Sequence, residues 1–150
     1  MTAERGTDDT TTGRCLCGDV TYAFTGPASS SYYCHCETCR RQCSAPVTAF
    51  VNVPRRNFRF TGTAPAAFQS SPGIKRLFCG RSGSPFAYDG DWDEEEIHLY
   101  LGTLDDPSAI VPDQHVFEGE RLAWFDTTDD TPRYAGSSLT GSPTHYGPRQ

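Results

Sequence analysis

The spacing of the cysteines constrains this chain more than any other feature of its sequence. Seven cysteines occur in 150 residues, and five of them lie in two short groups, Cys15-Leu16-Cys17 and Cys34-His35-Cys36-Glu37-Thr38-Cys39. Because side chains alternate along an extended strand, a C-x-C pair places both sulfurs on one face. A C-x-x-C turn brings two sulfurs together on a small loop. Since zinc is held by several thiolates that converge on one point, each group predicts part of a metal site.

Composition supports this prediction and limits the possible partners. Hydrophobic residues make up 36% of the chain, so the core is small and metal cross-links would stabilise it. A net charge of −6 argues against a nucleic-acid partner. No apolar run reaches the ~20 residues that cross a bilayer, so no membrane partner is expected. The polar start of the sequence predicts no secretory signal and a cytoplasmic location, where disulfides are rare. Composition thus argues against nucleic-acid and membrane partners, and the oligomeric state is left open.

The hydrophobic pattern predicts a mainly β fold in a single domain. Alternation over Val20–Thr25 is typical of a half-buried strand, and Gly26-Pro27 ends it. Further strands are expected at 47–53, 58–61, 66–70, 74–79 and 97–101, separated by turn signals. Helical structure is expected only over Glu37–Cys43 and in a turn around Asp105–Ser108.

The two ends of the chain are expected to be loose. Residues 1–12 are predicted to form a flexible leader, 13–136 the zinc-binding β domain, and 137–150 a flexible Ser/Gly/Pro-rich tail. The acidic run Asp89–Glu96 is interpreted as a solvated hairpin, because it lacks the alternating oxygen ligands of a calcium loop.

Several ordered motifs, spanning residues 13–134, resemble the glutathione-dependent formaldehyde-activating enzyme family. They are G-x-C-x-C-G at Gly13–Gly18, C-H-C-x-x-C-R at Cys34–Arg40, F-C-x-x-x-G-S at Phe78–Ser84, and matches at Gly102–Pro107, Pro112–His115 and around Trp124. The resemblance implies a zinc-stapled, multi-sheet β fold of the β-tent type, as in methionine-R-sulfoxide reductases.

The resemblance also implies two zinc sites. A structural zinc would be held by Cys15, Cys17 and Cys79, and a catalytic-type zinc, with its fourth position open, by Cys34, Cys36 and Cys39. An open position lets zinc present glutathione as a thiolate. The implied reaction is that of a carbon–sulfur lyase, which condenses glutathione or a related thiol with formaldehyde or a related aldehyde to S-hydroxymethylglutathione.

The chain departs from the family pattern at two positions. The last structural cysteine of the family falls on Ser82, whose neutral hydroxyl is a poorer zinc ligand, so this first site is expected to be weakened but occupied. Cys43 lies one helical turn after Cys39 and is either a small buried residue or a fourth ligand to the second zinc. A closed four-cysteine site would make the protein a non-catalytic zinc module that binds a partner protein. Thiol–sulfoxide redox chemistry, a third reading, has only Cys43 as a spare thiol.

Other polar and aromatic residues near the motifs are assigned lesser roles. His35 lies between two ligands and is expected to point away from them, and His115 is expected to pack or hydrogen-bond. Glutathione carries two carboxylates, so a cation near the zinc is expected, although surface solvation explains the same residues. The nearest cations in the sequence are Arg40, Arg41, Lys75 and Arg76. Trp92 and Trp124 are interpreted as core aromatics or as a lid over the sheet.

Overall fold

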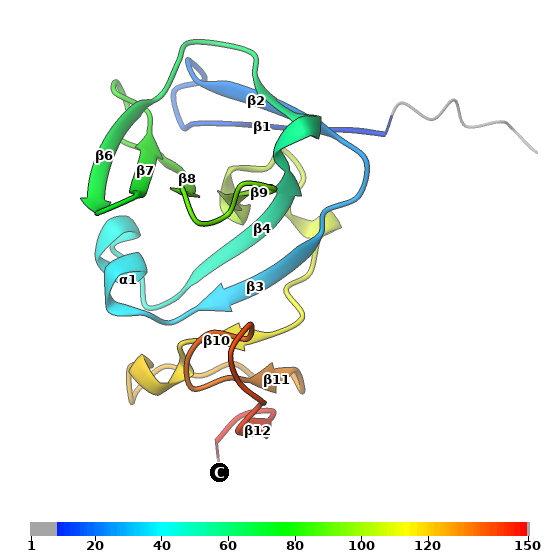
Figure 1. Cartoon of the computed structure of the whole chain (residues 1–150), viewed down its shortest axis with the longest axis vertical. Coiled ribbons are helices and arrows are strands. Elements are labelled where there is room, and N and C mark those ends of the chain that lie inside the picture. Colours follow the sequence, from blue (N-terminus) through cyan, green and yellow to red (C-terminus); the bar gives the residue numbers. More distant parts are fainter. Residues whose placement is uncertain (1–8, 150) are drawn as a thin grey trace, which may run out of the picture.

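The structure is a computed structural model that describes residues 9–149, and it shows a mainly β domain (Figure 1). The described residues form two sheets and one α-helix, α1, over Glu37–Cys43. The strands are β1 Thr10–Arg14, β2 Thr21–Thr25, β3 Ser30–Cys34, β4 Thr48–Pro54, β5 Phe58–Phe60, β6 Ala66–Ser71, β7 Ile74–Phe78, β8 Pro85–Gly90, β9 Glu96–Tyr100, β10 His115–Val116, β11 Pro132–Arg133 and β12 His145–Tyr146. The 3-10 turns are Arg55–Asn57, Leu101–Thr103, Pro107–Ala109 and Glu118–Glu120.

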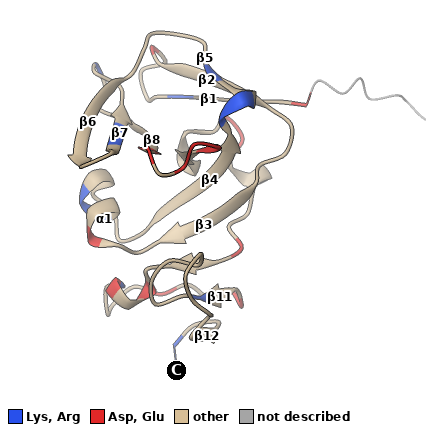
Figure 2. Ribbon diagram, in the orientation of Figure 1, with Lys and Arg blue, Asp and Glu red and all other residues tan. Residues whose placement is uncertain are grey.

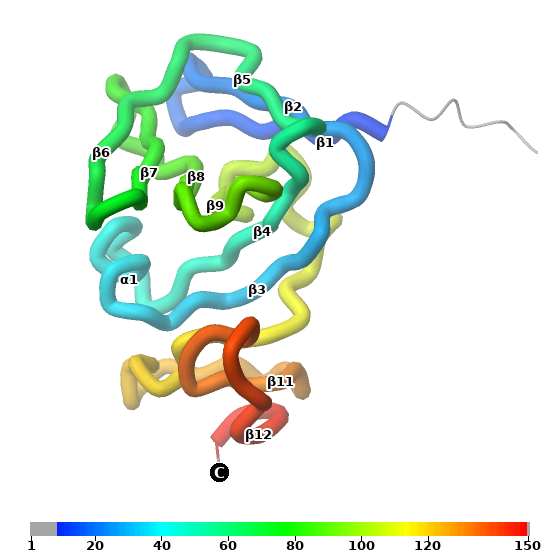
Figure 3. Tube along the Cα trace, in the orientation of Figure 1, coloured from blue at the N-terminus to red at the C-terminus, as the bar shows by residue number. Residues whose placement is uncertain are grey.

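A small sheet and a large sheet make up the fold. The small sheet has the strand order β1-β2-β5 and the large one β12-β11-β10-β3-β4-β9-β8-β7-β6. Nearly all pairs are antiparallel, but β10 runs parallel to both β3 and β11. Figure 3 shows β11 and β12 beyond β3, at one end of the molecule. None of the helices within residues 9–149 is long and apolar enough to span a membrane.

The two faces of strand β4 contact different parts of the interior. Val51 and Val53 belong to the main hydrophobic core, which also holds Tyr22 and Phe24 of β2. Phe50, which precedes Val51 and points to the opposite face, packs in a second cluster with Cys34, Cys39, Tyr100 and Val116. Because successive side chains of a strand point to opposite faces, the sheet separates the core from the face that carries the second cysteine group.

Most of the expected elements are confirmed, including α1 with the predicted bounds. The six expected strands correspond to β2, β4, β5, β6, β7 and β9, each shifted by no more than about a residue at either end. The pattern missed β1, β3, β8 and the three two-residue strands. β1 is rich in threonine and glycine and shows no apolar alternation, so its pairing with β2 through the backbone has no counterpart in the hydrophobic pattern. The likeness to the β-tent remains a prediction.

Both ends of the chain contact the rest of the domain where the structure describes them. Thr10–Thr12, assigned to the leader, pair with β2 instead, and residues 1–8 lie outside the described residues. In the tail, β12 pairs with β11. The Arg149 guanidinium donates from Nε to Glu118 at 3.0 Å, and Glu118 is only 1% exposed. A buried carboxylate requires a charged partner, so this contact fixes the tail against the domain.

At Gly13, β1 packs so closely against Tyr22 and Thr103 that no side chain fits. A Cβ at Gly13 would overlap the ring of Tyr22 and lie 2.7 Å from the carbonyl oxygen of Thr103. The Gly13→Ala variant is therefore expected to lose about 1–3 kcal/mol of unfolding free energy in urea denaturation. Gly102→Ala is the matched control, since no atom lies within 4 Å of its added Cβ, and it should change stability by less than about 0.5 kcal/mol. Equal effects of the two variants would contradict this packing.

Candidate metal centres

The first cysteine group brings together residues that are more than 60 positions apart in the sequence. Cys15 and Cys17 follow β1, and Cys79 follows β7, yet the Cys15 and Cys17 sulfurs are 3.4 Å apart and those of Cys17 and Cys79 3.7 Å apart. Arg81 strengthens this junction through an ion pair with Asp19 at 3.1 Å. All seven cysteines are unpaired. Three converging sulfurs supply three of the four ligands that zinc takes in structural sites.

Ser82, where the sequence resemblance led us to expect a cysteine, lies beside this group. Its backbone N–H donates to the Cys79 sulfur at 3.3 Å. Hydrogen bonding from the Ser82 hydroxyl is the main cause that lowers the pKa of Cys79 to about 6. The Arg81 N–H also donates to this sulfur, at 3.4 Å. These donors stabilise a thiolate, which is the form that binds metal. A hydroxyl thus stands where a fourth sulfur would complete the site.

The second group is assembled locally at the start of α1. Cys34 ends β3, Cys36 is the residue that caps α1, and Cys39 lies in the first turn of that helix. The sulfurs of the three lie within 4.8 Å of one another. The Cys36 sulfur accepts the backbone N–H of Cys39 at 3.3 Å. Cys34 and Cys39 are each 4% exposed. The turn at the strand–helix junction therefore produces the convergence that the spacing predicted.

The three sulfurs of the second group cannot all be charged without a cation. Hydrogen bonding from Cys34 holds the pKa of Cys36 well below its usual range, and the same bond raises the pKa of Cys34 far above it. For Cys39, the bond with Cys34 lowers the pKa, but Cys36 and burial outweigh it, and the pKa rises to about 11. The proximity of the three sulfurs therefore disfavours three thiolates at once. A divalent ion would release the remaining protons, as zinc binding to thiols does.

Arg76 is a buried cation whose charge is directed at this group. It is 4% exposed, and its Nη1 donates to the Cys39 sulfur and to the Tyr100 hydroxyl, both at 3.4 Å. Its guanidinium carbon lies 4.8 Å from the centre of the Tyr88 ring. Burial would lower the pKa of Arg76, but the contacts with Cys39 and Tyr100 raise it. No carboxylate in residues 9–149 forms an ion pair with Arg76, so the thiolate cluster is its counter-charge.

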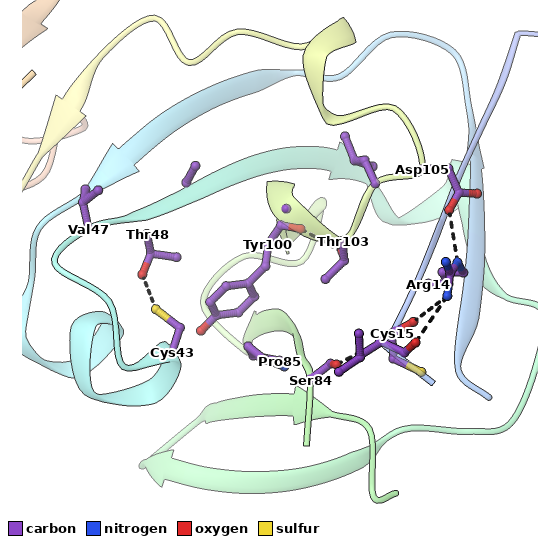
Figure 4. A pocket seen from close by; sticks show the side chains of 14 residues that line it. Arg14, Cys15, Cys43, Val47, Thr48, Ser84, Pro85, Tyr100, Thr103 and Asp105 are labelled. Carbon is purple, nitrogen blue, oxygen red and sulfur yellow. Dashed lines mark hydrogen bonds and ion pairs between the residues drawn. The ribbon is translucent and has the colours of Figure 1, made fainter. Parts of the chain in front are cut away.

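Cys43 is placed away from the second group. Its sulfur is 2.8 Å from the Thr48 hydroxyl and donates to the Cys39 carbonyl oxygen at 3.0 Å, as Figure 4 shows for the Thr48 contact. It lines a separate cavity of about 540 Å³ that also borders Cys15. Among the described residues, the sulfurs that converge are those of Cys34, Cys36 and Cys39 without Cys43.

His35 and His115, the two histidines near the motifs, hydrogen-bond to each other and to a carboxylate. His35 is fully buried, and its Nε2 lies 2.8 Å from His115 Nδ1. His115 Nε2 in turn lies 3.2 Å from the carboxylate of Asp129. Burial lowers the pKa of His35 to about 4, so the ring is neutral. As predicted, His35 points away from the sulfurs and joins β3 to β10 and the loop after it.

The second group opens into a cavity of about 580 Å³, a volume typical of small-molecule sites. Phe50 and Val116 form part of its wall, together with Arg76. Trp92 also lines it and is 56% exposed, and Trp124 is 76% exposed, so neither is the core aromatic that the sequence suggested. Of the other expected cations, Arg41 pairs with Glu37 on the helix surface, and Arg40 donates to the His35 carbonyl oxygen.

The cavity contains polar residues that the sequence did not single out. Asp93 and Glu96, at the end of the acidic run, line it with His98, and the ligand atoms of the three lie within 4.8 Å of one another. The run is therefore only in part the solvated hairpin expected, since Asp91 and Glu94 are exposed but Asp93 and Glu96 are half-buried. Period-two alternation over β9 places His98 opposite the core residues Ile97 and Leu99, and this signal could have identified it.

Zinc binding by single-cysteine variants tests the assignment of the sulfurs. The full chain, purified with zinc, is expected to hold two zinc ions in native mass spectrometry. Cys36→Ala should lose one of them, because two protein sulfurs hold zinc much more weakly than three. Cys43→Ala, the matched control on the same helix, should retain both. Loss of a zinc ion from Cys43→Ala would contradict the geometry.

At Ser82 a ligand can be added instead of removed, which should raise the zinc affinity of the first group. Ser82→Cys places a fourth thiolate beside the first group, and zinc affinity there is expected to rise at least about tenfold, or ~1.4 kcal/mol. Competition with a chromophoric chelator measures this change. Ser82→Ala serves as the comparison and should not tighten binding. An unchanged affinity in Ser82→Cys would show that this side chain does not face the metal.

Comparison with known proteins agrees with the family resemblance of the sequence motifs. The profile described as glutathione-dependent formaldehyde-activating enzyme matches residues 10–120, about three quarters of the chain. A crystal structure of a Rhodobacter sphaeroides protein is similar in fold, with a TM-score of 0.53 and 19% identity over 67% of this chain and 97% of that one. Curated protein sequences give no match. The family match covers more than half of the chain, so the chain belongs to the glutathione-dependent formaldehyde-activating enzyme family.

Proposed function

We propose that this protein is a zinc-dependent carbon–sulfur lyase that condenses a thiol, glutathione or a relative of it, with formaldehyde or a related aldehyde. The observation that carries the proposal is the convergence of the Cys34, Cys36 and Cys39 sulfurs at a cavity of about 580 Å³. Three protein ligands are typical of catalytic zinc, which keeps its fourth position for a small molecule. Family membership supports the same type of activity.

The residues around the sulfurs fit this chemistry. Bound at the three thiolates, zinc would lower the pKa of a coordinated thiol and so supply a nucleophilic thiolate. In the condensation, the S–C bond forms at the aldehyde carbon, the π bond of C=O breaks, and the thiol proton ends on the oxygen. Arg76 balances the negative charge of the cysteines through its contact with Cys39. Phe50 and Val116 limit water at the wall of the cavity.

The alternative, a non-catalytic zinc module that binds a partner protein, requires Cys43 to close the second site. The contacts of its sulfur with Thr48 and with the Cys39 carbonyl oxygen favour the open form instead. We place the second zinc at the open site and a structural zinc at Cys15, Cys17 and Cys79. Free thiolates persist in a reducing compartment, so we propose a cytoplasmic location.

Catalysis must be separated from the spontaneous reaction, because formaldehyde and glutathione also combine without an enzyme. Exchange NMR at equilibrium measures the rate at which formaldehyde and the S-hydroxymethyl adduct interconvert. The zinc-loaded protein is expected to accelerate this exchange above the uncatalysed rate. Cys36→Ala should abolish the acceleration with its far-UV circular dichroism retained, and Cys43→Ala should keep it. Exchange no faster than in buffer, at full zinc loading, would contradict the proposal.

A further inference from the structure

The cavity that borders the second cysteine group continues across the sheet as a row of polar side chains. In the antiparallel register, Ser30 of β3 faces Asn52 of β4, Asn52 faces His98 of β9, and His98 faces Tyr88 of β8. All four line the cavity. The two core residues that flank Asn52 in β4, Val51 and Val53, point to the other face. The cavity therefore has two ends of different chemistry, one with sulfurs and one with oxygen acceptors.

Asn52 indicates that this second end is built for a ligand. Its side chain lines the cavity although it is only 7% exposed, and its Oδ1 atom has no hydrogen-bond donor among the described residues. A buried amide oxygen without a donor destabilises a fold, and nearly all such atoms in proteins find one. A ligand that donates a hydrogen bond would satisfy this atom.

Carboxylates surround the same end of the cavity. Figure 2 shows acidic residues gathered in the segment between β8 and β9, and of these Asp93 and Glu96 line the cavity. Burial would raise the pKa of Asp93, but the hydrogen bonds from His98 and from the Glu96 backbone outweigh it and lower the pKa. The Glu96 carboxylate makes no ion pair or hydrogen bond with any residue in the range 9–149. It is a half-buried acceptor that is free to bind a cation.

Aromatic rings complete the environment of these carboxylates. Trp92 lies with its ring centre 5.7 Å from that of His98 and 6.4 Å from that of Tyr88. It is exposed and borders the cavity. The face of an aromatic ring attracts a cation, and indole does so most strongly. Carboxylates, an amide oxygen and an exposed indole together form a surface suited to an ammonium group.

The cavity offers little to a carboxylate ligand. Among its described lining residues, Arg76 is the one arginine or lysine, and it already contacts Cys39, Tyr100 and Ser70. Glu120 also lines the cavity and adds a further negative charge. Carboxylates that enter here meet like charges, which disfavour their binding.

We propose that the end of the cavity formed by Asn52, Asp93, Glu96 and Trp92 binds the ammonium group of the thiol substrate. The preferred substrate is then an aminothiol whose carboxylates are few or masked. This inference rests on the proposed function, because the sulfur of the same molecule would occupy the metal end. A metal ion fits this end less well, since both ring nitrogens of His98 are engaged, Nδ1 with the Tyr32 hydroxyl at 2.7 Å and Nε2 with Asp93 at 2.9 Å.

Three forms of glutathione distinguish the contribution of its ammonium group to binding from that of its carboxylates. Isothermal titration calorimetry of the zinc-loaded full chain measures the affinities of glutathione, of its diethyl ester and of N-acetylglutathione. The ester, which keeps the ammonium and masks both carboxylates, is expected to bind most tightly. N-Acetylglutathione, which lacks the ammonium, is expected to bind at least about tenfold more weakly than glutathione, as expected for a lost charge-assisted hydrogen bond.

Substitutions of the acidic residues test whether this end of the cavity causes the preference for the ammonium group. Glu96→Gln should reduce the preference for glutathione over N-acetylglutathione by about tenfold while zinc content and far-UV circular dichroism stay unchanged. Asp93→Asn is a second variant with the same expected direction. Glu94→Gln removes an exposed neighbouring charge that does not line the cavity, and it should leave the preference intact.

The outcomes distinguish this inference from the proposed function. Equal affinities for glutathione and N-acetylglutathione, with catalysis intact, would overturn the ammonium site alone. A third zinc ion per chain that disappears in Glu96→Gln would also overturn it, because the carboxylates would then be metal ligands. Failure of all three thiols to bind would overturn both proposals together.

Discussion

The charge balance between the second cysteine group and Arg76 is the interaction on which the rest of this structure depends. A guanidinium that is 4% exposed needs a negative partner, and within the described residues it contacts the sulfur of Cys39, which becomes such a partner when it loses its proton. The sulfurs in turn need a cation to be thiolates together, because their mutual proximity raises the pKa of Cys34 and Cys39. A divalent ion bound by three thiolates would carry one net negative charge, which the Arg76 guanidinium would neutralise. This balance makes a metal at the bottom of the cavity compatible with a buried position.

The large sheet makes this arrangement possible because one of its faces packs in the core and the other lines the cavity. Residues such as Val51, Val53 and Leu99 fill the core, and the residues that alternate with them line the cavity. The first cysteine group belongs to the core side, where Cys15 and Cys79 are buried among hydrophobic residues. The second group belongs to the cavity side. The two cysteine groups thus lie in different clusters on the two sides of the sheet.

Features that depend on local spacing could be predicted from the sequence. The sulfur of Cys39 meets those of Cys34 and Cys36 because six residues form one strand–helix turn, and α1 itself follows from the same stretch. Cys79 could be assigned to the first group only through the family motif, since nothing local links it to Cys15. Helical spacing alone could not decide whether the sulfur of Cys43 is a fourth ligand of the second group. The decisive partner is Thr48 on β4, which lies beyond the end of the helix.

Features that depend on strand register could not be predicted in this way. Asn52 and His98 are 46 positions apart and meet because β4 pairs with β9 in one of several possible registers. The burial of Arg76 likewise follows from the position of β7 over α1, and its sequence neighbours resemble an ordinary surface strand. The acidic run looked solvated because its composition does not reveal which of its carboxylates turn inward.

The coordination of the second metal site tests the central claim most directly. Cobalt(II) substituted for zinc in the full chain reports its ligands through thiolate-to-metal charge-transfer and ligand-field absorption bands. An open three-sulfur site predicts that adding glutathione raises the charge-transfer absorbance and shifts the ligand-field bands toward those of four sulfurs, in the wild type and in Cys43→Ala alike. A spectrum that already shows four sulfurs at this site and does not respond to thiol would contradict the account.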